Sequence, residues 1–314
     1  MRIRVLGLGV RLAVLATFAV FFIAPVVWLV LAPTKSDKAL ITSSPFSFGD
    51  FHHVALAWKH LDAFSSHIFR RWIGNTLFYA LSATAITLVA GVPAGYGLAI
   101  GRFPGRKLVL SLTLVVMIVP AAALVLPIFL ELNAVHLIGS SFSVILPFSF
   151  FPFGVYLAYL YYATALPPSL LDAARVDGCG ELQTFLRVAL PLAKPIVALV
   201  FFFSFVADWN NFFLPYVVLA DSNQYPITVG LWDLLSSTPS FNPAVGGGGQ
   251  SVKIFKPELA LATLIAVVPV AIVFLFSQRA LVRGLVGAAK VIGHEIGSHG
   301  PNLTLALPLV KRPS

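Results

Sequence analysis

Charged side chains are scarce in this sequence of 314 residues: they make up 11% of it, whereas hydrophobic residues make up 58%. A soluble domain carries roughly 25% charged residues because its surface must be solvated. The mean hydropathy of +0.91 points the same way. A soluble globular fold is therefore excluded. Because the apolar residues fall in runs long enough to cross a bilayer, the sequence predicts an all-α integral membrane protein.

Cysteine and nucleotide-binding motifs are nearly absent as well. The single Cys179 excludes an intramolecular disulfide framework, and no second cysteine is present to build a thiolate metal cluster. Residues 101–107 only superficially resemble a phosphate-binding loop, since the glycine spacing is wrong and no hydroxyl follows Lys107. We expect no enzyme activity, metal site or cofactor in this chain.

The apolar runs predict six transmembrane helices, each near or above the ~20 residues that a spanning helix needs. They lie at residues 12–34, 72–101, 108–130, 143–165, 195–220 and 259–278. Between the fourth and fifth lies a polar segment at residues 166–194. A transmembrane domain of residues 1–290 is expected, followed by a mobile cytoplasmic tail at residues 291–314, where the helical periodicity is lost.

The net charge of +9 is explained by orientation in the membrane rather than by nucleic-acid binding, which we do not expect. With the N-terminus in the cytoplasm, fourteen of the 21 lysines and arginines fall in inner segments and seven in outer ones. Inner loops carry the excess of positive charge in membrane proteins. Both termini are therefore predicted to be cytoplasmic.

The inner segment at residues 166–194 has its own helix signals. Pro167, Pro168 and Ser169 can start a short amphipathic helix over residues 170–176, and Gly178 permits a left-handed turn that ends it. A second short helix, with Phe185 and Leu186 on one face, is expected to run to Pro191. Such a pair of helices could insert into the groove of a partner protein or lie on lipid headgroups, and the residues alone leave both interpretations open.

This segment resembles the EAA loop of permease subunits in binding-protein-dependent ABC importers. The motif is an acid followed by two alanines, a glycine, and a closing aliphatic residue and Leu-Pro, and it is met by Asp172, Ala173, Ala174, Gly178, Val188, Leu190 and Pro191. Asp172 stands where Glu is usual. Further stretches look like the carbohydrate-uptake branch, and most like its MalG type: Arg71-Trp72-x-x-Asn75-Thr76, residues 95–106, residues 209–212 and residues 278–290.

The resemblance implies the type I ABC importer permease architecture in the inner membrane, and sugar import by alternating access. It also implies the partners: a homologous second permease, two ATPase subunits that bind ATP and Mg, and an extracytoplasmic sugar-binding protein, with lipid around the spans. The ATPases would receive the loop through Asp172, Ala173, Ala174, Asp177, Gly178, Leu190 and Pro191. Import of a polyol or phosphorylated polyol is an alternative within the family.

Asp208 is the one acid inside the predicted span 195–220, and an ionisable group there is costly enough to suggest function. With Trp209, Asn210 and Asn211 it could line the translocation path and hydrogen-bond or stack on a sugar. The i, i+3 spacing of Asp208 and Asn211 places both on one helix face, with Trp209 elsewhere. A structural hydrogen bond between helices is an equal alternative for Asp208, and a proton-coupled secondary transporter that uses Asp208 is a more distant one.

Two pairs of glycines in the predicted span 72–101 have the spacing that lets membrane helices approach closely. They are Gly91 with Gly95, and Gly97 with Gly101. We expect both pairs to serve helix packing.

Overall fold

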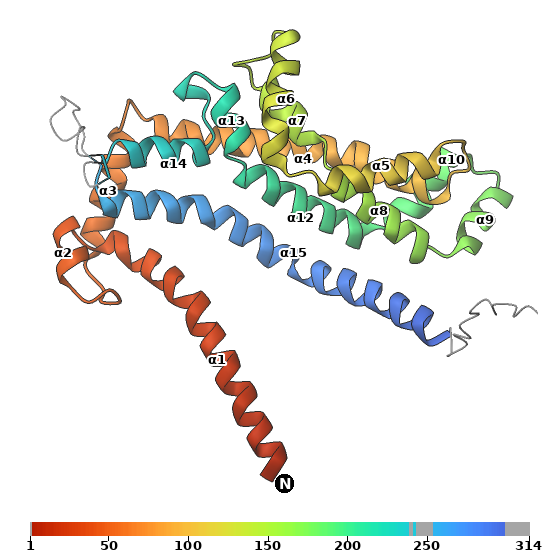
Figure 1. Cartoon of the computed structure of the whole chain (residues 1–314), viewed down its shortest axis with the longest axis horizontal. Helices are drawn as coiled ribbons and strands as arrows, with labels where there is room; N and C mark the ends of the chain where they lie inside the picture. Colours follow the sequence, from red (N-terminus) through yellow and green to blue (C-terminus); the bar gives the residue numbers. More distant parts are fainter. Residues whose placement is uncertain (1, 239–240, 243–253, 299–314) are drawn as a thin grey trace, which may run out of the picture.

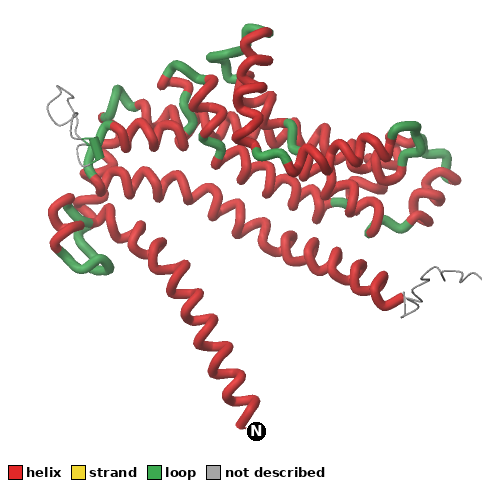
Figure 2. Tube along the Cα trace, in the orientation of Figure 1, coloured by secondary structure: helices red, strands yellow, loops and turns green. Residues whose placement is uncertain are grey.

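The computed structural model describes residues 2–238, 241–242 and 254–298, in which every regular element is a helix (Figures 1 and 2). The long helix α4 (Ile68–Ile100) packs against α12 (Lys194–Asn210), which in turn packs against α15 (Lys256–Ser298). The prediction of an all-α fold is confirmed for the described chain.

The other helices are α1, which is also long and leaves the bundle, and a set of shorter helices that complete the bundle and its two ends. They are α1 (Arg2–Leu31), η1 (Ala32–Thr34), α2 (Asp37–Thr42), α3 (Phe51–Ala63), α5 (Arg106–Ile118), α6 (Ala121–Ala134), α7 (Phe142–Ser149), α8 (Pro152–Thr164), α9 (Pro168–Val176), α10 (Glu181–Thr184), η2 (Phe185–Ala189), α11 (Leu190–Leu192), α13 (Phe213–Val218), η3 (Ser222–Gln224) and α14 (Ile227–Ser236).

Among the described residues, four helical segments are long and apolar enough to cross a membrane. They are Arg11–Thr34, Ile68–Ile100, Phe142–Thr164 and Lys256–Gln278, and they match the predicted spans 12–34, 72–101, 143–165 and 259–278. The other two predicted spans are interrupted. The total is four, or up to six if each of two bent helix pairs is one span.

The predicted span 108–130 is not one straight helix, because α5 and α6 meet at an angle of 109°. The break lies at Val119 and Pro120. A proline disfavours helical geometry in the residue before it, and Val119 is extended, with φ −70° and ψ 124°. Pro120 then caps the start of α6.

The predicted span 195–220 also fails as one helix. Helix α12 ends at Asn210, and Asn211 is extended, with φ −68° and ψ 125°. If the helix continued, the ring of Pro215 would clash with the carbonyl of Asn211, four residues earlier. The chain therefore breaks there and restarts as α13.

The fourth span keeps its length but is divided into α7 and α8 at Phe150 and Phe151. Pro152 is the first residue of α8, and Phe151 before it has left the helical region, with φ −121° and ψ 81°. Two of the three breaks thus lie next to a proline, and the third lies four residues before Pro215.

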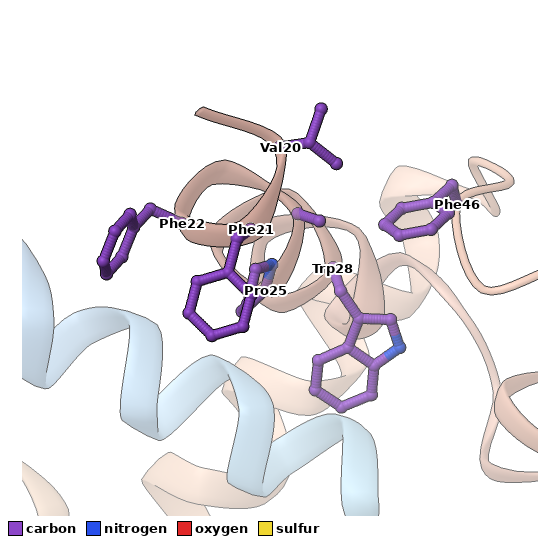
Figure 3. A pocket seen from close by; sticks show the side chains of 7 residues that line it. Val20, Phe21, Phe22, Pro25, Trp28 and Phe46 are labelled. Atoms are coloured by element: carbon purple, nitrogen blue, oxygen red, sulfur yellow. The ribbon is translucent and has the colours of Figure 1, made fainter. Parts of the chain in front are cut away.

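Helix α1 leaves the bundle, as Figure 1 shows, and none of its most apolar stretch is buried within the chain. Near its C-terminal end, an apolar hollow of about 570 Å³ lies between α1 and Phe46 of the α2–α3 connection (Figure 3). Phe21, Pro25 and Trp28 are among the side chains that line it. This surface is suited to lipid or to another subunit, because within the described residues it is uncovered.

The segments between the first and second predicted spans and between the fifth and sixth, which the predicted orientation places outside, contain helices of their own. Helices α2 and α3 lie within residues 33–71, and α14 lies within residues 221–258. At the other limit of the chain, α15 continues to Ser298, so residues 291–298 of the expected tail are helical. Residues 299–314 lie outside the described residues.

Gly95 lies at a close contact between α4 and α8. A Cβ atom at Gly95 would lie 2.5 Å from the Cβ of Ala158 and 2.7 Å from the amide nitrogen of Tyr159. Gly91 faces Val155, which also lies on α8. A Cβ atom at Gly91 would be 3.5 Å from Cγ2 of Val155, an ordinary van der Waals distance. The packing role predicted for this pair is confirmed. By contrast, a Cβ at Gly97 would meet nothing within 4 Å.

We expect Gly95→Ala to lower the thermal unfolding temperature of the purified subunit in detergent, because backbone atoms of α8 cannot move out of the way. Overpacking of this kind costs about 1–3 kcal/mol. Gly97→Ala on the same helix is the control, and it should unfold at or slightly above the parent temperature because alanine favours helix. Equal unfolding temperatures for the two variants would contradict the packing.

Candidate functional site

Helix α9 is the amphipathic helix predicted in the segment 166–194. Pro168 opens it at the first helical position, where the fixed φ of proline is already helical. Leu171 and Ala174 are buried against the bundle, whereas Asp172 and Ala173 are exposed. The motif residues on α9 thus lie on two faces: Ala174 is on the face that packs against the bundle, and Asp172 and Ala173 are on the face that the described chain leaves exposed.

Gly178 ends α9 in a left-handed turn, as predicted. Its φ is +81°, a conformation that costs side-chain-bearing residues energy. The Gly178 amide donates to the carbonyl of Arg175 at 3.0 Å, and the Cys179 amide donates to that of Ala174 at 3.0 Å. These two bonds form a Schellman motif, which satisfies carbonyls at the helix end and fixes the direction of the chain beyond it.

Arg175 links α9 to the next helix through two carboxylates. Its guanidinium donates to Asp172 Oδ1 at 3.3 Å and to Glu181 Oε1 at 3.1 Å. The hydrogen bond to Glu181 is the main reason that the pKa of Arg175 is raised above its usual value. Because the three side chains are exposed, this network orients the turn more than it stabilises the fold.

The second short helix exists, but Phe185 and Leu186 do not share a face as predicted. Phe185 is buried against the rings of Tyr96 and Tyr162, whereas Leu186 is 50% exposed. Adjacent helical residues are about 100° apart, so one of the two can be buried while the other is exposed. The closing Leu190 is half-buried and Pro191 is exposed.

Helices α9 and α10 lie at the right of Figure 1, and this end of the bundle carries exposed apolar side chains that we call the apolar knob. We define it by Val176, Leu182 and Leu186, which are 87%, 70% and 50% exposed. The exposed motif residues Asp172, Ala173 and Asp177 share α9 and its C-terminal turn with Val176. The loop therefore presents an apolar and partly acidic surface that the described chain does not cover.

A cavity of about 510 Å³ lies where the three broken helices come together. It is bounded by the α5–α6 bend, the α7–α8 break and the end of α12. Its polar side chains are Asp208 and Asn211, and the rest of its lining is apolar. Binding sites of membrane transporters are commonly built at such interrupted helices.

Asp208 is held in place from two helices. Its Oδ2 accepts hydrogen bonds from Thr84 Oγ1 of α4 at 3.1 Å and from Ser204 Oγ at 3.2 Å. The residue is 8% exposed. The structure thus contains the hydrogen bond between helices that was one interpretation of Asp208, and it also places Asp208 at the cavity.

The structure brings Asn211 to the same cavity, but Trp209 and Asn210 lie elsewhere. Trp209 is buried, and its indole nitrogen donates to the carbonyl of Ala266 on α15 at 3.0 Å. Asn210 is exposed and bonds the Val206 carbonyl of its own helix. Asn211 reaches the cavity from extended backbone beyond the helix end, so the i, i+3 argument for its position does not apply.

Threonines bind the carbonyls that the helix breaks release. Thr87 Oγ1 donates to the carbonyl of Ser149 at 3.0 Å, at the end of α7. Thr228 Oγ1 donates to the carbonyl of Asn211 at 2.8 Å, at the end of α12. Neither threonine could be identified from the sequence, because a threonine in an apolar run gives no local sign of its partner.

The stretch from Arg71 to Thr76, noted above only for its resemblance, binds the chain between α13 and α14. Asn75 donates to the carbonyls of Asn223 and Tyr225, and Trp72 donates to that of Ser222. The Ile227 amide donates to Thr76. These contacts join segments about 150 positions apart, a pairing that the sequence pattern could not show.

Comparison with known proteins identifies the family. The family model for the inner membrane component of binding-protein-dependent transport systems matches residues 88–287. The chain belongs to this family.

Two relatives of this permease are named as sugar transport proteins. The arabinooligosaccharides transport system permease AraQ of Bacillus subtilis is 36% identical, over 71% of this chain and 74% of its own. The diacetylchitobiose uptake permease NgcG of Streptomyces coelicolor is 29% identical, over 85% and 83%. A solved bacterial ABC transporter for the acidic polysaccharide alginate has the same fold, with a TM-score of 0.73 and 24% identity over 88% of this chain and 96% of that one.

The resemblance to carbohydrate-uptake permeases is thereby confirmed. The chain is a multi-pass membrane protein and a permease subunit of an ABC importer that works with other components of its transporter. It is a transport subunit and not an enzyme, since ATP hydrolysis in this family belongs to partner ATPases.

We expect Trp209→Phe to destabilise the permease by about 1 kcal/mol, because the hydrogen bond to Ala266 is lost in the bundle core. Thermal unfolding in detergent measures this. Asn210→Ala is the neighbouring control and should stay within about 0.5 kcal/mol of the parent, since that side chain is exposed. A stability loss in Asn210→Ala as large as that in Trp209→Phe would show that the core contact is not the cause.

Proposed function

We propose that this permease forms half of the translocation pathway of an ATP-driven sugar importer in the cell membrane. A homologous second permease forms the other half. Two ATPase subunits that bind ATP and Mg and an extracytoplasmic sugar-binding protein complete the transporter. The observation that carries the proposal is the 166–194 loop, whose ordered turn presents an uncovered apolar knob on a chain of this family.

The loop is proposed as the part that the ATPases move. Its knob offers apolar surface to a groove, while buried Leu171, Ala174 and Phe185 tie it to the bundle. Helix α12 follows the loop directly at Lys194 and runs to the cavity. At ~1.5 Å per residue, Asp208 lies about 20 Å along this helix, so one rigid element joins the loop to the cavity.

Asp208 and Asn211 are the side chains that we assign to the sugar path. They are the polar groups of the cavity at the helix breaks, where hydroxyl groups of a passing sugar would need partners. Trp209 and Asn210 are assigned to packing and to the surface. The sugar-transport names of the relatives support this cargo over a polyol, and nothing in the geometry favours a proton-coupled carrier, which would not need the loop.

Six spans with both termini in the cytoplasm remain our proposal for the topology. Contacts within the chain support it, because segments placed on one side by the charge rule lie together. Residues of the Arg102–Arg106 turn and of α9 line one hollow, whereas Lys256 pairs with Asp37 at 3.7 Å elsewhere. The inner end would then be the end that carries the knob.

We expect a cysteine at Lys38 to react with an impermeant maleimide in intact cells, and one at Arg102 to react only after the membrane is opened. Both positions are exposed, and they belong to the predicted outer and inner segments. The unaltered chain, with Cys179 alone, gives the background labelling. The reverse pattern would contradict the orientation.

We expect Gly178→Asp to keep the subunit assembled in the membrane but to lower ATP-driven sugar uptake at least tenfold. The change strains the left-handed turn and adds an acid beside Asp177 in the surface offered to the ATPases. Uptake and ATP hydrolysis are measured together in proteoliposomes that contain the whole transporter.

Two controls separate strain from charge. Gly178→Asn has nearly the same shape and tolerates the left-handed region, so it should retain more uptake than Gly178→Asp. Gly180→Ala should behave as the parent, since Gly180 has an ordinary φ of −67° and open space around it. Parent-level uptake with Gly178→Asp would refute the role of the loop in coupling.

A further inference from the structure

The cavity at the three helix breaks is lined by one acidic side chain and by no basic one among the described residues. Among the described residues that line it, Asp208 is the ionisable one, and no lysine, arginine or histidine is present to neutralise it. Asn211 is uncharged, and the remaining lining is aliphatic or aromatic, including Phe148, Phe151 and Phe213. When Asp208 is ionised, its carboxylate therefore sets the sign of the electrostatic potential among these lining residues.

The two oxygens of Asp208 have different surroundings. Oδ2 accepts both hydroxyl hydrogen bonds, from Thr84 and Ser204. Oδ1 has no hydrogen-bond partner among the described residues, and this oxygen is not fully buried. Asp208 lines the cavity, and Oδ1 is the oxygen whose acceptor sites are not taken by Thr84 or Ser204. A passing molecule thus meets an acceptor atom that its own donors can satisfy.

A single acceptor in an apolar enclosure discriminates by charge. Burial weakens solvent screening, so a carboxylate repels an anion more strongly there than at a water-exposed surface. Hydroxyl and ammonium groups can donate to Oδ1, and an ammonium group also gains from the faces of nearby aromatic rings. A carboxylate, sulfonate or phosphate group can donate nothing when ionised.

We propose that Asp208 makes this cavity selective against negatively charged cargo. Granted the proposed transport function, the substrate is then an uncharged or amino-bearing sugar rather than a uronate, a sulfonated sugar or a phosphorylated polyol. Membership in the family does not settle this point, because the solved transporter with the same fold is one for an acidic polysaccharide.

Charged thiol reagents test the cavity without knowledge of the cargo. A cysteine at Ala207, an exposed position of the lining next to Asp208, is treated in the assembled transporter with a cationic and an anionic methanethiosulfonate. The ratio of the two reaction rates is compared with the ratio when Asp208→Asn is also present. Any change in ionisation of the thiol cancels in this ratio.

We expect Asp208→Asn to lower the ratio of cationic to anionic rate about tenfold or more at Ala207→Cys. The same ratio should change much less at Ala121→Cys, which lines the cavity from α6. Labelling is read on this chain by intact-mass spectrometry, and the parent with Cys179 alone gives the background.

Three outcomes have distinct meanings. An unchanged ratio at Ala207→Cys would overturn the proposal, and so would a lack of labelling with either reagent in every nucleotide state, because the cavity would then be closed to water. If charge selectivity is present but the same preparation takes up no sugar with ATP, the electrostatic inference stands and the proposed transport function fails.

Discussion

The structure of this permease depends on one constraint, the need of backbone carbonyls in a membrane to find hydrogen-bond donors. The hydrocarbon region of a bilayer contains no water that could donate hydrogen bonds to these carbonyls. Breaks at Val119, Phe151 and Asn211 each interrupt a helix, and threonine hydroxyls supply donors at two of them. Because these breaks are stabilised from neighbouring helices, the chain can hold irregular backbone and a cavity inside its bundle.

Helix α4 provides much of that support. Thr84 binds Asp208, Thr87 binds the end of α7, and Gly95 lets α8 approach. At the end away from the loop, Trp72 and Asn75 hold the chain between α13 and α14. One continuous helix of 33 residues thus contacts every region on which the proposed function relies. The proposed movement of the loop and of α12 would need a rigid centre of this kind.

The structure of the 166–194 loop could be predicted from the sequence because its signals are local. Pro168 and Gly178 act on their own backbone angles, and both positions appear in the structure as predicted. The resemblance to the permease family rested on the same short segment. Long spans such as α4 could be predicted for a similar reason, since length and hydropathy are enough.

The helix breaks could not be predicted, although their prolines are plain in the sequence. Pro25, Pro93 and Pro269 lie inside continuous helices, whereas Pro120 and Pro152 adjoin breaks. A proline only removes one hydrogen bond and crowds one carbonyl, and neighbouring groups decide whether the helix continues. Those neighbours, such as Thr87 for Ser149, come from distant parts of the chain.

The same dependence on distant neighbours explains why the role of Asp208 was left open between packing and transport. The spacing of residues along a helix gives one direction for each side chain, but the two oxygens of a carboxylate can have different partners. One oxygen of Asp208 binds α4, which makes the acid part of the packing between helices. The other is left for the cavity. The two interpretations are therefore compatible, and the packing contact fixes where the charge stands.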